Sequence, residues 1–400
     1  MPSYPTRSDA QHVLAGRVIA REGPDVIVVA HGSARTIVQG AVSELESGDL
    51  VRLALRSDPG RDTELVSILE QHRTIRAPLV ARSETASLLA EGRLARLELR
   101  AQIRSAIRTA FDTRGYLEVE TPCLATCPGL DLHLRAFSVP QGNDPDAYLI
   151  TSPEYHMKRL VVGGVARCYQ FARCFRDGER GRRHEPEFTM LEWYHAWADR
   201  STMLDETVDV LRVAARAAGR DASVRIGEHD VRLDDGYEQL TVREAFGRWA
   251  SELGDPIELA ARDDAAYFQA VVERIEPNLG FQRPTFLTRF PAAHASLSRL
   301  AADDPSVCER FEMFVGGVEL SNGFVELTDP REQRARFERD QRDRADARLD
   351  AYPVDEAFLS ALEEGMPPTV GNALGFDRLC ALVAGRDSIA DVMAFPVARR

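Results

Sequence analysis

The chain has 400 residues, of which 44% are hydrophobic and 28% are charged, and its formal net charge at pH 7 is −13. This composition excludes a disordered or fibrous protein and allows one large α/β core with a small accessory domain. The acidic balance argues against a protein that coats nucleic acid non-specifically, although a local arginine cluster could still bind one phosphate-bearing ligand. The start MPSYPTRSDAQ has no apolar core behind a basic segment, and no stretch reaches the roughly 18 apolar residues of a membrane span. We therefore expect a soluble, cytoplasmic protein.

The cysteines and the single lysine limit the kinds of metal site and nucleotide site that the chain can form. The six cysteines form no CxxC pair and lie mostly in apolar stretches, which predicts buried free thiols rather than a metal cluster. They are Cys123, Cys127, Cys168, Cys174, Cys308 and Cys380. Lys158 is the only lysine and follows Met157, so a phosphate-binding P-loop and a kinase-type lysine are both excluded. A nucleotide bound by this chain is expected to be bound by arginines.

The first part of the chain has the pattern of a small barrel. Residues 13–71 alternate five short apolar strands with Gly, Pro and Asp turns, which predicts an OB-like β-barrel. This stretch contains no Phe, Tyr or Trp, the side chains on which bases stack, so an oligonucleotide-binding barrel and a structural or partner-docking barrel both remain open. Residues 72–83 are expected to form a linker, which gives two domains at residues 1–75 and 76–400.

A long helix and a strand are predicted next. Apolar residues recur at helical spacing over residues 85–114, and Gly115 is expected to end this helix. The strand that follows is closed by Pro122. The pair could be plain scaffold or the seam of a dimer.

Residues 148–175 predict a strand, a turn at Ser152-Pro153-Glu154, a helix and a second strand. Glu154 lies where the helix opens, so it is either a helix cap or a ligand for an ammonium group. Residues 202–301 are expected to be helical with loops, apart from an apolar strand that ends at Ala292.

The densest chemistry lies in residues 174–194, CFRDGERGRRHEPEFTMLEWY. The pattern predicts a strand, a charged loop and a second strand, because Pro186 favours extended backbone after the loop. An arginine such as Arg176 can place two donors on a phosphate, and Phe188, Trp193 and Tyr194 offer rings behind the charges. The alternative is a solvated hairpin tip.

Two later stretches complete the candidate site. Glu319 and Glu326 are seven residues apart, and a turn predicted at Ser-Asn-Gly between them would let them face each other from two strands. Such a carboxylate pair would need a divalent cation or an ammonium between its members; otherwise the turn splays the two into water. Residues 371–385 predict a glycine-spaced strand and an apolar helix, where a flat ligand can approach the backbone beneath Arg378.

Taken together, these motifs resemble the catalytic domain of the class II aminoacyl-tRNA synthetases. The strand ending near Pro122 resembles the family's first motif, FRDGERGRRHEPEF the second and GNALGFDR the third. TSPEYHMKRL, HEPEFTMLEWY and VELSNGFVELTDPREQRARFERD are similar to the lysine branch, and most similar to its stand-alone lysyl-tRNA synthetase paralogues that modify elongation factor P. The resemblance runs from about Ser83 to the C-terminus. It implies an α+β fold in which the N-terminal barrel is followed by an antiparallel sheet flanked by helices. It also implies a homodimer.

The resemblance also implies roles for individual residues. Arg176 would hold the α-phosphate of ATP, Phe188 and Arg378 would enclose the adenine, and Arg176 and Arg378 would be catalytic. Glu319 and Glu326 would bind Mg²⁺. The amino acid would be recognised by Ser152, Pro153, Glu154, Tyr194 and Glu326. The full set of ATP contacts would be Arg176, Asp177, Gly178, His184, Glu185, Phe188, Glu319, Leu320, Gly375 and Arg378.

The implied activity is ATP-dependent activation of lysine or β-lysine to an aminoacyl-adenylate and its transfer to a lysine of elongation factor P. Ala373 stands where the tRNA-charging enzymes carry Gly, which favours this branch. The N-terminal barrel favours the alternative, a lysyl-tRNA synthetase that charges tRNA. A non-catalytic regulator with the same fold is a third hypothesis. Gly178 and Glu185 depart from the family pattern, which has Glu and Asn there.

Overall fold

The computed structural model describes residues 11–57, 63–73, 84–89, 92–132, 134–142, 144–221 and 223–397. The chain divides into two compact units, Met1–Arg100 and Ala101–Arg400, which are described separately. The predicted linker at residues 72–83 and the domain boundary between residues 75 and 76 fall largely on 74–83, outside the described residues. Within the described residues, no helix combines the length and the apolar character that crossing a membrane requires.

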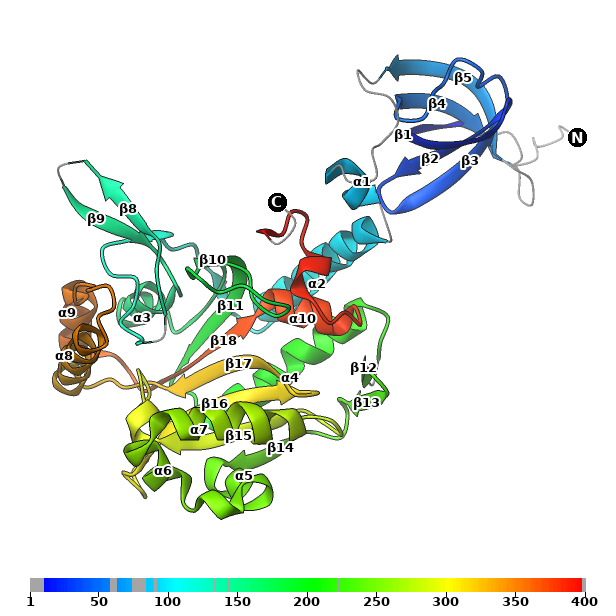
Figure 1. The fold of residues 1–400 in the computed structure, drawn as a ribbon. Helices are drawn as coiled ribbons and strands as arrows, with labels where there is room; N and C mark the ends of the chain where they lie inside the picture. The colour runs from blue at the N-terminus through cyan, green and yellow to red at the C-terminus, as the bar shows by residue number, and fades with distance from the viewer. Residues whose placement is uncertain are drawn as a thin grey trace, which may run out of the picture. The chain divides into compact units, whose positions relative to one another are not determined.

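The first unit contains a closed five-stranded barrel in the order β1-β2-β3-β5-β4, shown in blue in Figure 1. Alternate residues of its strands point inward, and Val18, Ile27 and Leu53 are completely buried. At Gly16 an added Cβ would lie 2.4 Å from Ala30 O, so two strands approach closely there. The predicted barrel is confirmed. Its strands are β1 (Gln11–Gly23), β2 (Val26–His31), β3 (Ala34–Gln39), β4 (Leu50–Arg56) and β5 (Thr63–His72).

The predicted helix over residues 85–114 is two helices, α1 (Glu84–Leu89) and α2 (Arg93–Thr113). Gly92 precedes α2 with a φ of +71°, a left-handed conformation that a helix cannot continue through. The end at Gly115 is confirmed by its φ of +75°. The strand predicted to close at Pro122 is shorter than expected, because β6 comprises only Leu117–Glu118.

The second unit is built on an eight-stranded sheet in the order β14-β15-β16-β17-β18-β11-β10-β6 (Figure 1). The pairs from β15 to β10 are antiparallel, and the parallel pairs β14/β15 and β10/β6 lie at the two edges. The predicted antiparallel sheet is therefore confirmed. Its strands are β14 (Glu238–Thr241), β15 (Thr285–Pro291), β16 (Val307–Val315), β17 (Val318–Val325), β18 (Thr369–Gly375), β11 (Glu187–Ala196), β10 (Arg167–Phe175) and β6 (Leu117–Glu118).

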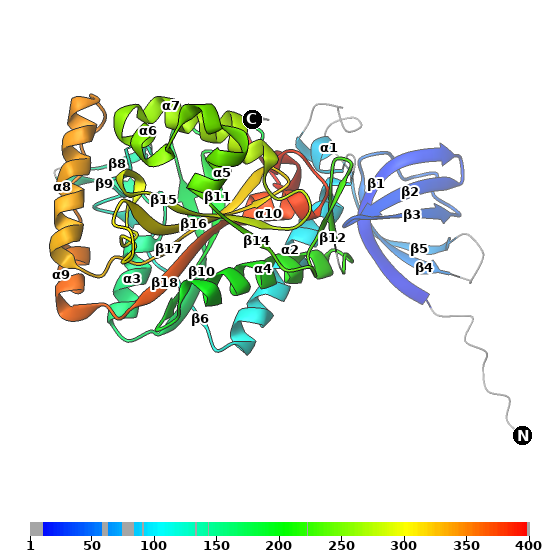
Figure 2. The ribbon, with the colours of Figure 1, turned by 90° about the horizontal axis from the view of Figure 1, so that it is seen from below.

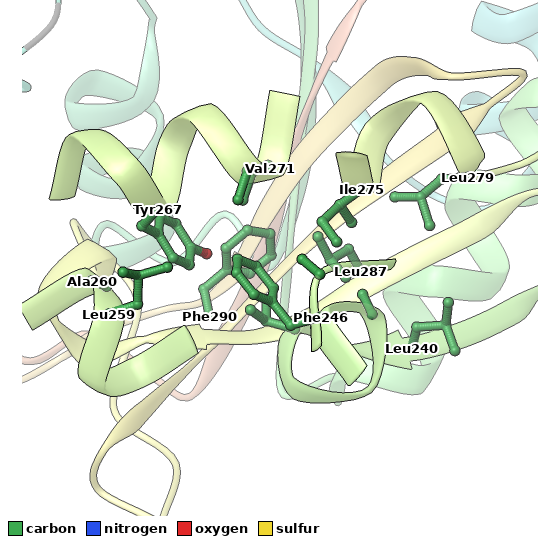
Figure 3. Packing of buried hydrophobic residues seen from close by; sticks show 14 of the residues in the cluster. Leu240, Phe246, Leu259, Ala260, Tyr267, Val271, Ile275, Leu279, Leu287 and Phe290 are labelled. Carbon is green, nitrogen blue, oxygen red and sulfur yellow. The ribbon is translucent and has the colours of Figure 1, made fainter. Parts of the chain in front are cut away.

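Helices on one flank of this sheet pack over β14, β15 and β16. Figure 3 shows their core, in which Phe246, Tyr267 and Ile275 meet Leu287 and Phe290 of β15. Thr241 and Glu244 form a capping box that fixes the start of α5. The elements are the α-helices α5 (Val242–Trp249), α6 (Pro256–Arg262) and α7 (Asp264–Ala270), the 3-10 helices η1 (Ser251–Leu253), η3 (Glu276–Asn278) and η4 (Ala292–His294), and the π-helix η2 (Val271–Ile275).

Among the remaining helices, α4 and α10 pack against each other and against the central strands β18 and β11. In both views α8 and α9 lie side by side, and α3 packs against α9 (Figures 1 and 2). A three-stranded sheet, β7-β9-β8, stands next to α3. The bounds are α3 (Glu154–Val162), α4 (Arg200–Ala217), α8 (Pro330–Asp346), α9 (Glu356–Gly365), α10 (Phe376–Val383), η5 (Ile389–Val392), β7 (Leu124–Ala125), β8 (Ser138–Gln141) and β9 (Asp144–Leu149).

Three further expectations can be compared with the fold. The strand that ends near Ala292 is confirmed as β15, but the region expected to be helical also contains β14 and a hairpin of β12 (Ser223–Ile226) and β13 (His229–Arg232). The turn predicted between Glu319 and Glu326 is wrong, because residues 318–325 form the single strand β17. All six cysteines are free, and all except the exposed Cys123 are buried as predicted.

Candidate active site

A cavity of about 370 Å³ opens beside the central strands of the second unit. Its walls come from the loop after β10, from β11, β17 and β18, and from the start of α10. The register aligns these walls, since Met190 is paired with Gly375 and Asn322 with Ala373, and all four line the cavity. The predicted residues that line it are Ser152, Glu154, Arg176, His184, Glu185, Phe188, Glu319, Leu320, Gly375 and Arg378.

Arg176 begins the charged loop, which has the predicted strand-loop-strand form. Its backbone N–H donates to Pro186 O at 2.9 Å and so closes the loop at its base. The guanidinium lies 5.1 Å from the centre of the Phe188 ring and 3.6 Å from Glu179. Stacking on the ring and pairing with one carboxylate restrict the guanidinium at the cavity wall, where it can meet an anionic ligand.

Arg378 lies in the first turn of α10 and is held by three residues. Its Nη1 donates to Glu319 O at 3.1 Å, its Nε donates to Arg183 O at 3.2 Å, and its Nη2 donates to His184 Nε2 at 2.7 Å. Arg378 and Phe188 both line the cavity, as the predicted enclosure of a flat ring requires. His184 contributes by holding Arg378, a contact that the sequence did not reveal.

Glu185, one of the two departures from the family pattern, has a structural partner. Its buried carboxylate accepts a 2.9 Å hydrogen bond from the backbone N–H of Val397. Elsewhere in the same loop, Arg182 O accepts a 2.9 Å hydrogen bond from Ile389 N–H. Glu185 therefore fastens the segment after α10 to the charged loop, and a carboxylate is a suitable acceptor for that backbone donor.

The other departure, Gly178, has a φ of +81° in the loop, which glycine adopts without strain. Neighbouring Asp177 pairs with Arg135 at 3.3 Å. Neither Asp177 nor Gly178 is among the residues that line the cavity, although Arg176 and Glu179 on either side of them are.

Glu319 and Glu312 bring two carboxylates to the cavity wall. Burial raises the pKa of Glu312 to about 7, although Arg310 pairs with it at 2.5 Å. Glu319 presents oxygen donors of the kind that Mg²⁺ takes, and this ion is usually held by one or two carboxylates and the phosphates of its substrate. The residues present therefore fit a magnesium ion that arrives with a nucleotide. Within the described part of the chain, no group of three or more His, Cys, Asp or Glu side chains forms a ready-made metal site.

Glu326 does not share the cavity wall with Glu319, contrary to the predicted pair. Glu319 lies in β17 and Glu326 directly follows this strand. No turn separates the two residues, so they do not face each other. Glu326 is instead 2.5 Å from the ammonium of Lys158, which also lies 2.6 Å from Glu154. Burial lowers the pKa of Lys158, but Glu154 and Glu326 outweigh this effect and raise it.

Glu192 is a second buried carboxylate that sequence reasoning missed. Ser152 Oγ donates to it at 2.9 Å and Tyr194 OH at 2.6 Å, so two predicted amino-acid contacts are oriented by one acid. Burial raises the pKa of Glu192 to about 8. Glu154, Lys158, Glu192 and Glu326 form a buried polar cluster that reaches the cavity wall at Glu154, and we call it the carboxylate cluster. Pro153 precedes α3 and positions Glu154 in its first turn.

Gly371 explains how closely this cluster is packed. An added Cβ there would lie 2.4 Å from Glu326 Oε1 and 2.4 Å from Tyr194 Cε1. Gly371 is paired with Tyr194 on β11, and its missing side chain makes room for the two larger ones. Tyr194 and Glu326 are buried and do not line the cavity directly.

Comparison with known proteins identifies this architecture. Residues 79–399 match the family described as tRNA synthetases class II (D, K and N). The chain belongs to this class II synthetase family. The resemblance seen in the sequence motifs is thereby confirmed, and the match leaves the five-stranded barrel outside the family's domain.

Within the class II synthetase family, the chain is similar to two curated bacterial proteins. It is 41% identical to the "Elongation factor P--(R)-beta-lysine ligase" of Proteus mirabilis (strain HI4320) over 343 residues, which cover 79% of this chain and 99% of the relative. It is 40% identical over 325 residues to the protein of the same name from Enterobacter sp. (strain 638), again covering 79% of this chain and 99% of the relative.

Proposed function

We propose that the chain is an ATP-dependent ligase that activates lysine or β-lysine to an aminoacyl-adenylate and transfers it to a lysine of elongation factor P. The observation that carries this proposal is the sequence identity of 40–41% to two elongation factor P ligases along 99% of their length. The proposal extends their printed activity to this chain.

The division of charge around the cavity supports the proposal. Arg176 and Arg378 bring two cationic groups to the cavity wall, which would suit the triphosphate and the adenine of ATP, and Phe188 provides an aromatic face. Glu154 and Ser152 lie at the part of the wall that belongs to the carboxylate cluster. A cavity with cationic and anionic walls suits a nucleotide together with an amino acid that carries ammonium groups.

The reaction needs no nucleophile from the protein. A carboxylate oxygen of the amino acid would attack the α-phosphorus of ATP, the bond to the β-phosphate oxygen would break, and pyrophosphate would leave. Arg176 would stabilise the charge that develops on the α-phosphate, and Arg378 would orient the nucleotide. The ε-amino group of the acceptor lysine would then attack the carbonyl carbon, lose a proton and release AMP.

We propose that Glu319 holds a Mg²⁺ ion, which would offset the charge of the phosphates when ATP is bound. Glu312 faces the same cavity and would support this role. We assign Glu326 to anchoring Lys158, because its carboxylate lies 2.5 Å from the Lys158 ammonium and already pairs with it.

Two further expectations belong to the proposal. We propose that the protein acts in the cytoplasm, where its acceptor would be found, and that it works as a homodimer whose seam includes α2 and the strand before Pro122. Sedimentation of the purified protein would test the dimer. A monomer at micromolar concentration would contradict it.

The alternative is charging of tRNA with lysine, which the closed barrel favours, because OB-like barrels can bind single-stranded nucleic acid. The deciding experiment measures pyrophosphate exchange with lysine, β-lysine and ornithine, followed by transfer of the labelled amino acid to elongation factor P or to tRNA. Labelled elongation factor P is the expected result. Efficient charging of tRNA would favour the alternative, and an absence of exchange with every amino acid would leave the non-catalytic regulator.

A further inference from the structure

Lys158 is the only lysine of the chain and its side chain is completely buried. Its Nζ lies 2.6 Å from Glu154 Oε1, 2.5 Å from Glu326 Oε2 and 5.9 Å from the centre of the Phe358 ring. An ammonium group has three donors, and two carboxylates and a ring face surround this one. Lys158 is fully buried and is not among the residues that line the cavity.

The three charged side chains are arranged in a series from the cavity inward. Glu154 lines the cavity from the first turn of α3, Lys158 follows one helical turn later, and Glu326 lies at the end of β17. Lys158 occupies Oε1 of Glu154. Among the described residues, no hydrogen-bond donor to Oε2 of Glu154 is present. A substrate ammonium that enters the cavity can therefore meet this second oxygen.

Without Lys158 the same arrangement would be unfavourable. Glu154 and Glu326 would be two buried carboxylates near each other with no cation between them, and they would repel. Glu154 is the member that borders open space, so it is the side chain that would turn away. The direction of its carboxylate thus depends on a residue that does not touch the cavity.

We propose that Lys158 is a positioning residue of the amino-acid site, which fixes Glu154 so that its second oxygen receives an ammonium group of the substrate. Glu326 in turn holds Lys158, because its carboxylate binds the Lys158 ammonium. The inference deepens the proposed function and rests on it, since it assigns how the amino acid is recognised.

Lys158→Met tests this by removing the charge and keeping most of the volume. We expect the KM for lysine or β-lysine in pyrophosphate exchange to rise about 10- to 100-fold, the effect of a misplaced hydrogen bond to a charged group. The KM for ATP and kcat at saturating amino acid should stay within about twofold. A rise in both KM values together, or no rise in either, would overturn the inference.

A second variant separates positioning from folding. Lys158→Met with Glu326→Leu removes both members of the buried ion pair, which is often neutral for stability, whereas removal of one member is costly. We expect thermal stability to return toward that of the wild type while the KM for the amino acid stays raised. Recovery of this KM in the double variant would show that Lys158 serves the fold alone and would overturn the inference.

Val161→Ala is the matched packing control, because Val161 is buried on the same helix and carries no charge. It should lower the melting temperature and leave the KM for the amino acid unchanged. The wild-type protein in the same assay separates the two levels of the proposal. If it activates no amino acid, the proposed function fails and this inference falls with it; if it does and the variants keep its KM, the inference alone fails.

Discussion

Arg378 Nη2 donates a 2.7 Å hydrogen bond to His184 Nε2, which connects the charged loop to the first turn of α10. Burial and the neighbouring charge of Arg378 lower the pKa of His184, so the imidazole is neutral and can accept this hydrogen bond. The side chain that the resemblance assigned to ATP therefore has a second task. It helps to set the position of the arginine that would cover the nucleotide.

We expect His184→Ala to raise the KM for ATP about 10-fold, because Arg378 loses one of its charged hydrogen bonds. The KM for the amino acid should not change. Kinetics of pyrophosphate exchange over a range of ATP concentrations would measure the effect. Arg182→Ala is the control, since its exposed side chain is removed while its carbonyl still accepts from Ile389. An unchanged KM for ATP in His184→Ala would mean that Glu319 and Arg183 suffice to hold Arg378.

Arg176→Ala should reduce pyrophosphate exchange by at least about 100-fold, because one donor to a charge that develops in the transition state is worth that much. The fold should persist, since the guanidinium packs at the surface of the cavity against Phe188. Exchange rates and melting temperatures would be measured together. Arg173→Ala, on strand β10 just before Arg176 and with an exposed ion pair to Glu187, should keep full activity. Substantial pyrophosphate exchange by Arg176→Ala would contradict the assignment of Arg176 to the α-phosphate.

Gly371→Ala should destabilise the protein by about 1–3 kcal/mol, because the new methyl would press on Glu326 and Tyr194 in a packed interior. Displacement of these two side chains should also raise the KM for the amino acid. Gly247→Ala is the contrasting variant: nothing lies within 4 Å of the added Cβ in helix α5, and stability should rise slightly. Equal unfolding free energies for the two variants in urea would contradict the tight packing at Gly371.

Glu192 predicts a dependence of stability on pH. Burial raises its pKa to about 8 from an ordinary value of 4.5, so the folded chain holds a proton that the unfolded chain has lost in this interval. The free energy of unfolding should therefore fall as pH rises from about 5 to 8, with a slope of up to ~1.4 kcal/mol per pH unit from this group. Urea unfolding at several pH values would measure the slope.

Glu192→Gln should remove this contribution, because the amide does not ionise. Glu363→Gln on the exposed side of α9 should keep the wild-type slope. A slope in Glu192→Gln equal to that of the wild-type protein would assign the pH dependence to other groups, such as Glu326, whose pKa burial also raises to about 8.

The elements that could be predicted from the sequence are those whose structure depends on residues close together in the chain. The charged loop between β10 and β11 was recognisable from its density of charges and from Pro186, and the strand and helix at residues 369–383 from their glycines and apolar run. The barrel followed from alternation over short segments. Most of the predicted cavity residues then came together, because neighbouring strands place them in register.

The features that could not be predicted depend on contacts between residues far apart in the sequence. Ser321-Asn322-Gly323 has the composition of a turn, but ladders to β16 and β18 on both sides hold it extended. A Cβ added at Gly323 would lie 2.4 Å from the Phe311 ring and 2.7 Å from Gly371 O. In the sequence, Lys158 stands out only as the single lysine. A lysine normally lies in water, and nothing local indicates that Glu326, 168 positions later, would meet it in the interior.

The burial of the only lysine has a consequence for acylation itself. An aminoacyl-adenylate reacts with accessible amines, and a chain that makes one exposes its own surface to it. Here the single ε-amino group is fully enclosed and bound by two carboxylates, so the proposed enzyme offers no lysine to its own product. Labelled amino acid found on a lysine after the reaction can therefore be attributed to the added acceptor, without correction for self-modification.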